Sequence, residues 1–295
     1  MTKLIRLFLK PIFLLVFLMP RAFHRHLGNF IGILWFDILR IRRGLVLANI
    51  RLAYPEWNDD RIVMTARQAM CIVGRGIVDV VLIPFMSKSW VEKHVDFRGT
   101  EYYEVARQKA RQRGTGVGFL SLHLASGDLA VAAMSISGFP IHLITKEFKS
   151  AWLNDFWFSA RKKHGTRYIS DRKSSFDILK ALKKNEVVIF VLDQFMGPPI
   201  GTEVLFFGQK TGAAMGLAVI ADRAECPILP CFSYYEENDK FVIELGPEIQ
   251  FDRALDKNEM IKGMTQKYTD VLEAIIKKYP EQWMWVHRRW KEFKH

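Results

Sequence analysis

The sequence predicts an α/β fold with a mainly parallel central sheet covered by helices. After about residue 85, short apolar runs typical of strands alternate with helical stretches, and no Pro/Gly/Ser-rich linker divides the chain. The strand-like runs are Val117–Leu122, Ile141–Ile144, Val187–Leu192, Val204–Phe207, Ile228–Tyr234 and Phe241–Leu245. Helices are expected at about residues 100–112, 127–137, 150–164, 174–184, 211–223 and 257–277.

A longer helix is predicted from Asn58 to about Phe85, because apolar residues recur there at spacings of three and four. The acidic entry that begins at Asn58 is a plausible N-cap. The Gly-rich piece at 208–216 lacks the residue order of a phosphate-binding loop. It is therefore predicted to be a turn from a strand into a helix.

The composition excludes several protein classes. The chain has 295 residues, 49% of them hydrophobic, with 22 Phe and 8 Trp, which is too apolar for a disordered protein. No run of about 18 uncharged apolar residues occurs, which argues against a protein with several membrane spans. Three scattered cysteines form no disulfide framework and favour a reducing compartment.

The first 45 residues predict a membrane-associating helical segment, which precedes one domain over residues 46–295. Apolar residues of the stretch 4–19 are interrupted and followed by cations, and residues 27–39 are again apolar. Positive charge on both flanks gives no orientation for a spanning helix, so this segment either crosses the bilayer or lies in its interface. The alternative is an ordinary pair of buried N-terminal helices.

One pair of residues has the spacing of a general-base dyad. His123 follows the predicted strand 117–122, and Asp128 comes five positions later, at the expected start of the next helix. If the turn folds the carboxylate back onto the imidazole, Asp128 orients one ring nitrogen and leaves the other to take a proton from a hydroxyl. No Gly-x-Ser-x-Gly nucleophile motif is present, so a substrate hydroxyl would attack an activated acyl group directly.

Several motifs beyond this pair resemble those of the late acyltransferases of lipid A biosynthesis, over about residues 45–295. They are the His123…Asp128 pair, Arg161-Lys-Lys-His-Gly165, Ser170-Asp-Arg172, Asp193-Gln-Phe-Met-Gly-Pro198, Phe206-Phe-Gly208 and Tyr279-Pro-Glu-Gln-Trp-Met-Trp-Val-His-Arg-Arg-Trp-Lys291. The last is long and specific, and its aromatics and cations suit a membrane interface or a helix that closes the core. The resemblance implies a sheet like that of the glycerolipid acyltransferases.

The resemblance also implies a reaction, partners and a location. A fatty acyl chain would move from a thioester of acyl carrier protein or coenzyme A to a hydroxyl of a lipid A precursor, at the cytoplasmic face of the bacterial inner membrane. His123 would be the base and Asp128 would orient it. Arg161 and Arg172 would hold phosphate or thioester oxygen, with Lys146 in the same basic cluster. Asp193 would position a hydroxyl, pair with an arginine, or simply form a turn.

Two departures leave the acceptor open. Asp128 stands where most late acyltransferases have Glu and where glycerolipid acyltransferases have Asp, so a lysophospholipid or another glycolipid is an alternative acceptor. Phe195-Met196 replaces the commoner polar-aromatic pair. The net charge of +12 alone would also fit a non-catalytic membrane or nucleic-acid binding protein, although no nucleic-acid module is present. The histidines and cysteines show no metal-ligand spacing, and neither a metal nor a bound cofactor is expected.

Overall fold

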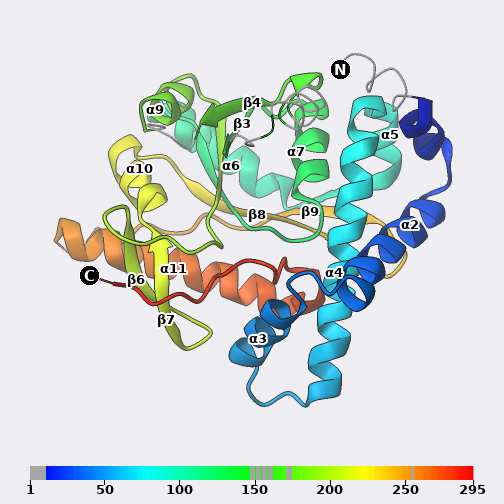
Figure 1. The fold of residues 1–295 in the computed structure, drawn as a ribbon. Coiled ribbons are helices and arrows are strands. Elements are labelled where there is room, and N and C mark those ends of the chain that lie inside the picture. The colour runs from blue at the N-terminus through cyan, green and yellow to red at the C-terminus, as the bar shows by residue number, and fades with distance from the viewer. Residues whose placement is uncertain are drawn as a thin grey trace.

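The computed structural model describes residues 11–146, 162–170, 175–253 and 256–294, together with residues 150, 154 and 158. A seven-stranded sheet with the order β1-β9-β8-β2-β5-β3-β4 forms its centre (Figure 1). Every neighbouring pair is parallel except β8 and β9, which run antiparallel. The predicted mainly parallel α/β sheet is therefore confirmed.

The strands of this sheet are short, and most begin and end close to the predicted positions. Their bounds are β1 Val95–Arg98, β2 Val117–Ser121, β3 Ile141–Thr145, β4 Arg167–Ser170, β5 Val187–Val191, β8 Ile228–Tyr235 and β9 Phe241–Leu245. The strands β1 and β4, which lie at the two edges of the sheet, have no counterpart in the prediction.

Helices cover both faces of the sheet. Buried residues of α6 (Thr100–Gln112) and α7 (Gly127–Ile136) belong to one apolar cluster, and those of α9 (Ser175–Lys183), α10 (Gly216–Ala224) and α11 (Lys257–Lys278) belong to the other. Consecutive residues of β2 point to opposite clusters, Phe119 to the first and Leu120 to the second. A strand that is buried on both faces reads as a continuous apolar run, which explains why β2, β5 and β8 were predictable.

The segment at 201–216 differs from the prediction. Strands β6 (Gly201–Phe206) and β7 (Gln209–Ala214) form a separate antiparallel hairpin, and α10 begins only at Gly216. Phe207 and Gly208 form its two-residue turn, with φ of 52° and 71°, the conformation that a tight hairpin turn requires. The predicted helix at 211–223 is thus wrong in its first third, which belongs to β7. Met196 packs tightly against this strand, since a Cβ added to Gly212 would lie 2.2 Å from the Met196 carbonyl oxygen.

Two further predicted helices have different outcomes. The long helix is confirmed as α4 (Asp59–Leu82), and the side chain of its N-cap Asn58 accepts a hydrogen bond from the Arg61 N–H at 2.9 Å. The predicted helix at 150–164 lies largely outside the described residues. Within the part of the chain that the structure covers, one helical stretch, Asp59–Phe85, is long and apolar enough to cross a membrane by length and composition, and half of its apolar window is buried inside the protein.

The N-terminal helices pack along α4. The described chain is helical over 11–18, then forms α2 (Arg21–Ile33), a π-helical turn at Leu34–Ile38 and α3 (Arg43–Ala53). Gly28 and Gly32 of α2 face Gly74 of α4 so closely that a Cβ added to Gly74 would lie 2.0 Å from the Gly28 carbonyl oxygen. The backbones of α2 and α4 therefore pack in direct contact. The remaining connecting elements are a 3-10 turn at Ile83–Phe85, α5 (Lys88–His94) and a 3-10 turn at Pro280–Gln282.

Candidate active site

His123 and Asp193 meet at the carboxyl edge of the sheet. Strands β2 and β5 are parallel neighbours, and their register places Ser121 opposite Val191. His123 and Asp193 each follow two residues after these positions, so the register brings both side chains to the same point. The carboxyl edge of a parallel sheet is where sites in this class of fold form.

Three hydrogen bonds converge on the Asp193 carboxylate. One oxygen lies 2.7 Å from Nδ1 of His123, and the other accepts from the His123 backbone N–H at 2.9 Å and from Nε1 of Trp283 at 2.7 Å. The Asp193 side chain has no exposed surface, whereas a third of the His123 side chain is exposed. A buried carboxylate requires such partners, because its charge is otherwise costly to remove from water.

This pair shifts the titration of both groups. Burial alone lowers the pKa of His123, but the charge and hydrogen bond of Asp193 outweigh it and hold the pKa above the ordinary 6.5. Burial alone raises the pKa of Asp193, but the charge of His123 and the three hydrogen bonds hold it well below the ordinary 3.8. Asp193 is therefore ionised at neutral pH. It accepts the Nδ1–H of the imidazole and leaves the lone pair on Nε2.

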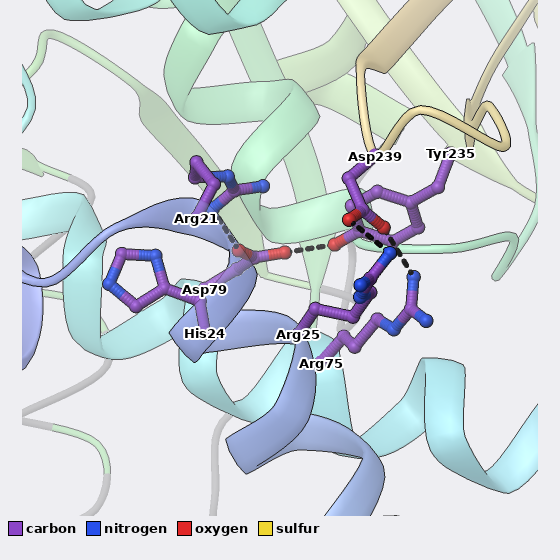
Figure 2. Close-up of a pocket in the computed structure, with 7 residues that line it drawn as sticks. All are labelled: Arg21, His24, Arg25, Arg75, Asp79, Tyr235 and Asp239. Carbon is purple, nitrogen blue, oxygen red and sulfur yellow. Dashed lines mark hydrogen bonds and ion pairs between the residues drawn. The ribbon is translucent and has the colours of Figure 1, made fainter.

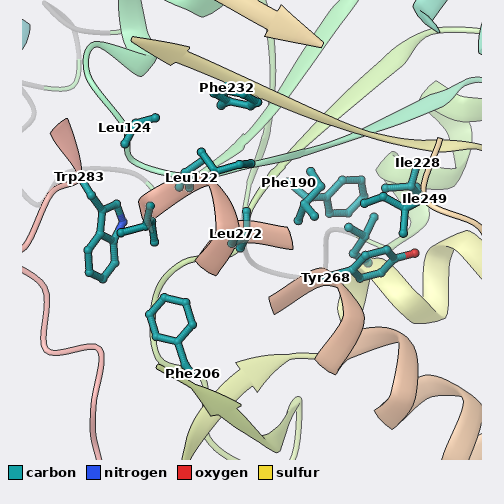
Figure 3. Packing of buried hydrophobic residues seen from close by; sticks show 14 of the residues in the cluster. Leu122, Leu124, Phe190, Phe206, Ile228, Phe232, Ile249, Tyr268, Leu272 and Trp283 are labelled. Carbon is teal, nitrogen blue, oxygen red and sulfur yellow. The ribbon is translucent and has the colours of Figure 1, made fainter. Parts of the chain in front are cut away.

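The C-terminal segment fixes the loop that carries His123. The His123 carbonyl accepts from the Met284 N–H at 3.0 Å, and the Ala125 N–H donates to the Gln282 carbonyl at 2.9 Å. Leu124 and Trp283 face each other in an isolated antiparallel bridge, and both are 1% exposed. Figure 3 shows these two side chains with Leu122 and Phe206 in the same apolar cluster. The backbone of the catalytic loop is thus held from the opposite end of the chain.

His287 and Gln194 lie on the open side of His123. The two imidazole rings are 4.9 Å apart between centroids. The Gln194 amide nitrogen lies 3.5 Å from Nε2 of each ring, which is the long limit of a hydrogen bond. Burial, followed by the charge of His123, lowers the pKa of His287 to about 4. A neutral His287 and a weakly bound amide therefore face Nε2 of His123.

Asp128 does not make the contact predicted for it, the hydrogen bond that orients the His123 imidazole. Asp128 lies half-buried in the first turn of α7, as predicted. The hydrogen bond on Nδ1 of His123, however, comes from Asp193, which the sequence indicated only as a partner for a hydroxyl or an arginine. The ring has a single Nδ1, so the orienting role belongs to Asp193 in this structure. A catalytic part for Asp128 stays a prediction.

The predicted basic residues are described only in part. Lys146 follows the carboxyl end of β3 and is exposed. Arg161 and Arg172 lie outside the described residues. Their assignment to phosphate or thioester oxygen, like that of Lys146, stays a prediction.

Sequence reasoning did not identify Trp283, Gln194 or His287 as parts of the site. All three lie inside motifs that carried the family resemblance, so the signal was available but gave no geometry. Residues 283–294 contain no helix; Trp283 and Trp285, each 1% exposed, close the core in an extended segment. The helix suggested for this segment is therefore wrong, and its part in closing the core is confirmed.

A second charged cluster joins α2, α4 and the β8–β9 hairpin (Figure 2). Asp79, which is 2% exposed, accepts hydrogen bonds from Arg21 at 3.1 Å and from the Tyr235 hydroxyl. Asp239 pairs with Arg25 at 2.7 Å and with Arg75 at 3.3 Å. The cavity that these side chains line measures about 10 Å³, room for one water at most. The cluster is therefore a structural junction, since it leaves no space for a ligand.

This junction connects to the catalytic loop. The backbone N–H and carbonyl of Tyr235 each bond to the Gln282 side chain at 2.9 Å. The Gln282 carbonyl in turn accepts from Ala125, two residues after His123. Arg21 of the N-terminal helix is thereby joined to the His123 loop through Asp79, Tyr235 and Gln282.

A hollow of about 390 Å³ lies at the amino ends of strands β3, β4 and β5, whereas His123 follows the carboxyl end of β2. Its wall includes His142 and Arg167, both bonded to Glu186. The hollow is therefore separated from His123 by the length of the strands. Among the described residues, no group of three or more His, Cys, Asp or Glu side chains is arranged to hold a metal ion.

The family comparison decides what this site belongs to. The family described as bacterial lipid A biosynthesis acyltransferase matches residues 2–292 of the chain. The chain is a member of this family. The family consists of enzymes that transfer acyl groups, and the family resemblance predicted from the sequence motifs is confirmed.

Individual relatives agree over most of their length. The lipid A biosynthesis lauroyltransferase of Escherichia coli is 26% identical over 283 residues, covering 94% of this chain and 88% of that protein. The lipid A biosynthesis palmitoleoyltransferase of the same organism is 22% identical over 270 residues, covering 90% and 84%. A solved 1-acyl-sn-glycerophosphate acyltransferase from Thermotoga maritima aligns with a TM-score of 0.39 and 11% identity, over 88% of this chain and 96% of that one. A likeness at that score adds nothing to the fold described above.

The Asp193 contact generates a prediction for the pH dependence of this acyltransferase. His123 accepts a proton only when it is neutral, so kcat/KM should rise with pH through a pKa above 6.5. Asp193→Asn removes the negative charge that raises this pKa. The acid limb should then move to lower pH, and the maximal rate should fall on the order of 10²–10⁴-fold because the imidazolium loses its counter-charge. An unchanged limb in Asp193→Asn, measured from pH 5 to 9, would contradict the assignment.

Proposed function

We propose that this lipid A acyltransferase moves a fatty acyl chain from a thioester of acyl carrier protein or coenzyme A to a hydroxyl of a lipid A precursor, with His123 as the base. The observation that carries the proposal is the Asp193–His123 hydrogen bond of 2.7 Å at the carboxyl edge of the sheet. It leaves the Nε2 lone pair on the exposed side of the ring, where the hydroxyl of a substrate can reach it.

The step balances without a protein nucleophile. Nε2 of His123 takes the proton of the acceptor hydroxyl while its oxygen attacks the thioester carbonyl carbon. The tetrahedral intermediate collapses by breaking the C–S bond, and the imidazolium returns the proton to the thiolate. An ester and a free thiol result. Asp193 stabilises the imidazolium between these two transfers, because a carboxylate buried beside it favours the charged form.

Predicted groups would complete this mechanism. Arg161, Arg172 and Lys146 are the predicted holders of phosphate and of the thioester oxygen, whose negative charge grows in the intermediate. Asp128, in the first turn of α7, completes the predicted catalytic set. The reaction requires no bound cofactor, since the thioester is itself the activated reactant.

The exposed surface of the N-terminal helices supports a membrane location. Leu15, Leu18 and Phe30 are 58%, 68% and 61% exposed, and further exposed apolar residues continue along the segment: Ile12, Leu14, Phe23, Ile33, Ile38, Leu39 and Ile41. Each large apolar side chain moved from water into lipid contributes about 1.5–3 kcal/mol before ordering is discounted. Neighbouring cations add attraction to an anionic leaflet. We therefore place the enzyme on the bacterial inner membrane, at its cytoplasmic face, where acyl thioesters are available.

Removal of the base tests the reaction. A folded His123→Ala enzyme should transfer acyl chains on the order of 10²–10⁴-fold more slowly than wild type, because positioned proton transfer supplies that much rate. Cells that depend on the variant should lack one acyl chain on lipid A, as read by mass spectrometry of lipid extracts. Wild-type lipid A in those cells would overturn the function, and a change confined to phospholipids or another glycolipid would select the alternative acceptor class.

The membrane location has its own test. Leu15→Glu with Leu18→Glu should release much of the protein from anionic liposomes in a flotation assay, and should lower activity on bilayer substrate more than on detergent-dispersed substrate. These positions leave the Arg21–Asp79 junction intact, which a deletion through residue 26 would not. Val105→Glu with Leu205→Glu is the matched control, since both residues are about half exposed, at 54% and 51%, and lie on other elements. Equal flotation of both double variants would contradict the location.

A further inference from the structure

Two arginines in the turn before α3 have no partner among the carboxylates. Arg40 and Arg42 are exposed, and within the described chain neither lies within ion-pairing distance of an acidic side chain. Asp37, the acidic residue of the same turn, is taken by Arg43 at 3.3 Å and by Arg67 at 2.8 Å. Neither guanidinium group is paired with a carboxylate of the described chain, so each keeps most of its hydrogen-bond donors for a ligand, although Arg42 donates one to the Val286 carbonyl.

The turn itself is held in an unusual and fixed conformation. Arg40 and Arg42 have φ of 51° and 58°, a left-handed region that residues with a side chain seldom adopt. Backbone and side-chain bonds maintain it: the Ile41 N–H donates to the Trp35 carbonyl at 3.1 Å, and Nε1 of Trp35 donates back to the Ile41 carbonyl at 3.2 Å. Strain that the surroundings maintain in this way is concentrated at binding sites.

This turn reaches the active site through the C-terminal segment. A guanidinium nitrogen of Arg42 donates to the Val286 carbonyl at 2.9 Å, one residue before His287. The side-chain amide of Asn49, in α3, donates to the carbonyls on both sides of Val286, that of Trp285 at 2.7 Å and that of His287 at 2.8 Å. His287 faces His123 with ring centroids 4.9 Å apart. Arg42 is thus bound to the same segment as the His287 ring that faces His123, and Arg40 lies two residues away in the same turn.

The residues that precede and separate the two arginines are apolar and exposed. Ile38, Leu39 and Ile41 are 66%, 57% and 45% exposed. Apolar side chains that alternate with unpaired cations suit a ligand with an anionic head group and acyl chains. A planar guanidinium binds phosphate through two parallel hydrogen bonds, which gives it the geometry for a phosphate monoester.

We propose that Arg40 and Arg42 form the subsite for a phosphate group of the glycolipid acceptor, which positions its reacting hydroxyl toward His123. This inference rests on the proposed function and names the part of the chain that recognises the acceptor. The subsite comes from the N-terminal segment, so that segment both carries the membrane-facing surface and selects the substrate.

Acceptor kinetics in detergent micelles test the subsite. Arg40→Ala and Arg42→Ala should each raise the KM for a phosphorylated diglucosamine lipid about tenfold, the effect of losing one charge-assisted contact. For Arg40→Ala, the variant that breaks no side-chain hydrogen bond of the described chain, kcat and the donor KM should stay within about twofold. The same lipid without its phosphates should show one KM for wild type and variants. Arg42→Lys should recover part of the affinity, because lysine retains the positive charge but lacks the paired donors of the guanidinium.

Controls separate this subsite from general effects. Arg51→Ala removes an exposed arginine of α3 that pairs with Asp59, and should leave the acceptor KM unchanged. Arg40 makes no side-chain hydrogen bond within the described chain, so its variant leaves the Val286 contact intact. Equal losses on phosphorylated and dephosphorylated acceptor, or an unchanged KM, would overturn the subsite. Weaker binding to phosphatidylglycerol vesicles at an unchanged acceptor KM would assign the arginines to bulk lipid instead, and would also overturn it.

Binding without turnover keeps this inference distinct from the proposed function. The affinity of His123→Ala protein for the phosphorylated lipid in micelles should fall about tenfold when Arg42→Ala is added. Such a fall would support the subsite even if wild-type enzyme transferred no acyl chain to that lipid, which would contradict the proposed function alone. An unchanged affinity would overturn the subsite whatever the activity.

Discussion

A carboxylate with no exposed surface, that of Asp193, is the constraint to which the rest of the site conforms. An ionised group in that position must be compensated, and it obtains compensation from the backbone and ring of His123 and from the indole of Trp283. These bonds require β2 and β5 to be adjacent and in register, and require the C-terminal segment to return to the sheet. The bond to Nδ1 also sets which ring nitrogen of His123 carries the proton. The bonds that compensate buried Asp193 in the folded protein therefore also orient the His123 ring.

The C-terminal segment and the N-terminal helices both act on the catalytic loop. Met284 and Gln282 hold the loop backbone, and Gln282 is itself held by Tyr235, whose hydroxyl shares Asp79 with Arg21. Asn49 and Arg42 hold the carbonyls around His287. Under the proposed function this arrangement would fix the exposed apolar helices, which are the proposed membrane-facing elements, relative to His123.

The sequence was sufficient for the fold class and singled out His123, but it was insufficient for the contact that orients the His123 ring. Strands β2, β5 and β8 were predictable because they are nearly continuous apolar runs, whereas the edge strands Val95–Arg98 and Arg167–Ser170 are short and half polar. Residues 213–215 favour a helix locally, whereas pairing with β6 makes residues 209–214 a strand. The Asp193 contact depends on the register of two strands 70 residues apart in the chain. No local pattern contains that register, so the nearer carboxylate, Asp128, was the natural choice for orienting His123.

In this structure buried Asp193 holds His123 as the Nδ1–H tautomer and raises the pKa of its ring. Nitrogen-15 NMR of the imidazole rings in detergent-solubilised enzyme, titrated from pH 3.5 to 9, tests it most directly, with His123→Ala to assign the resonance. Neutral His123 should carry its proton on Nδ1 and titrate with a pKa above 6.5, while its neighbour His287 should titrate with a pKa of about 4. A proton on Nε2, or a His123 pKa at or below 6.5, would contradict it.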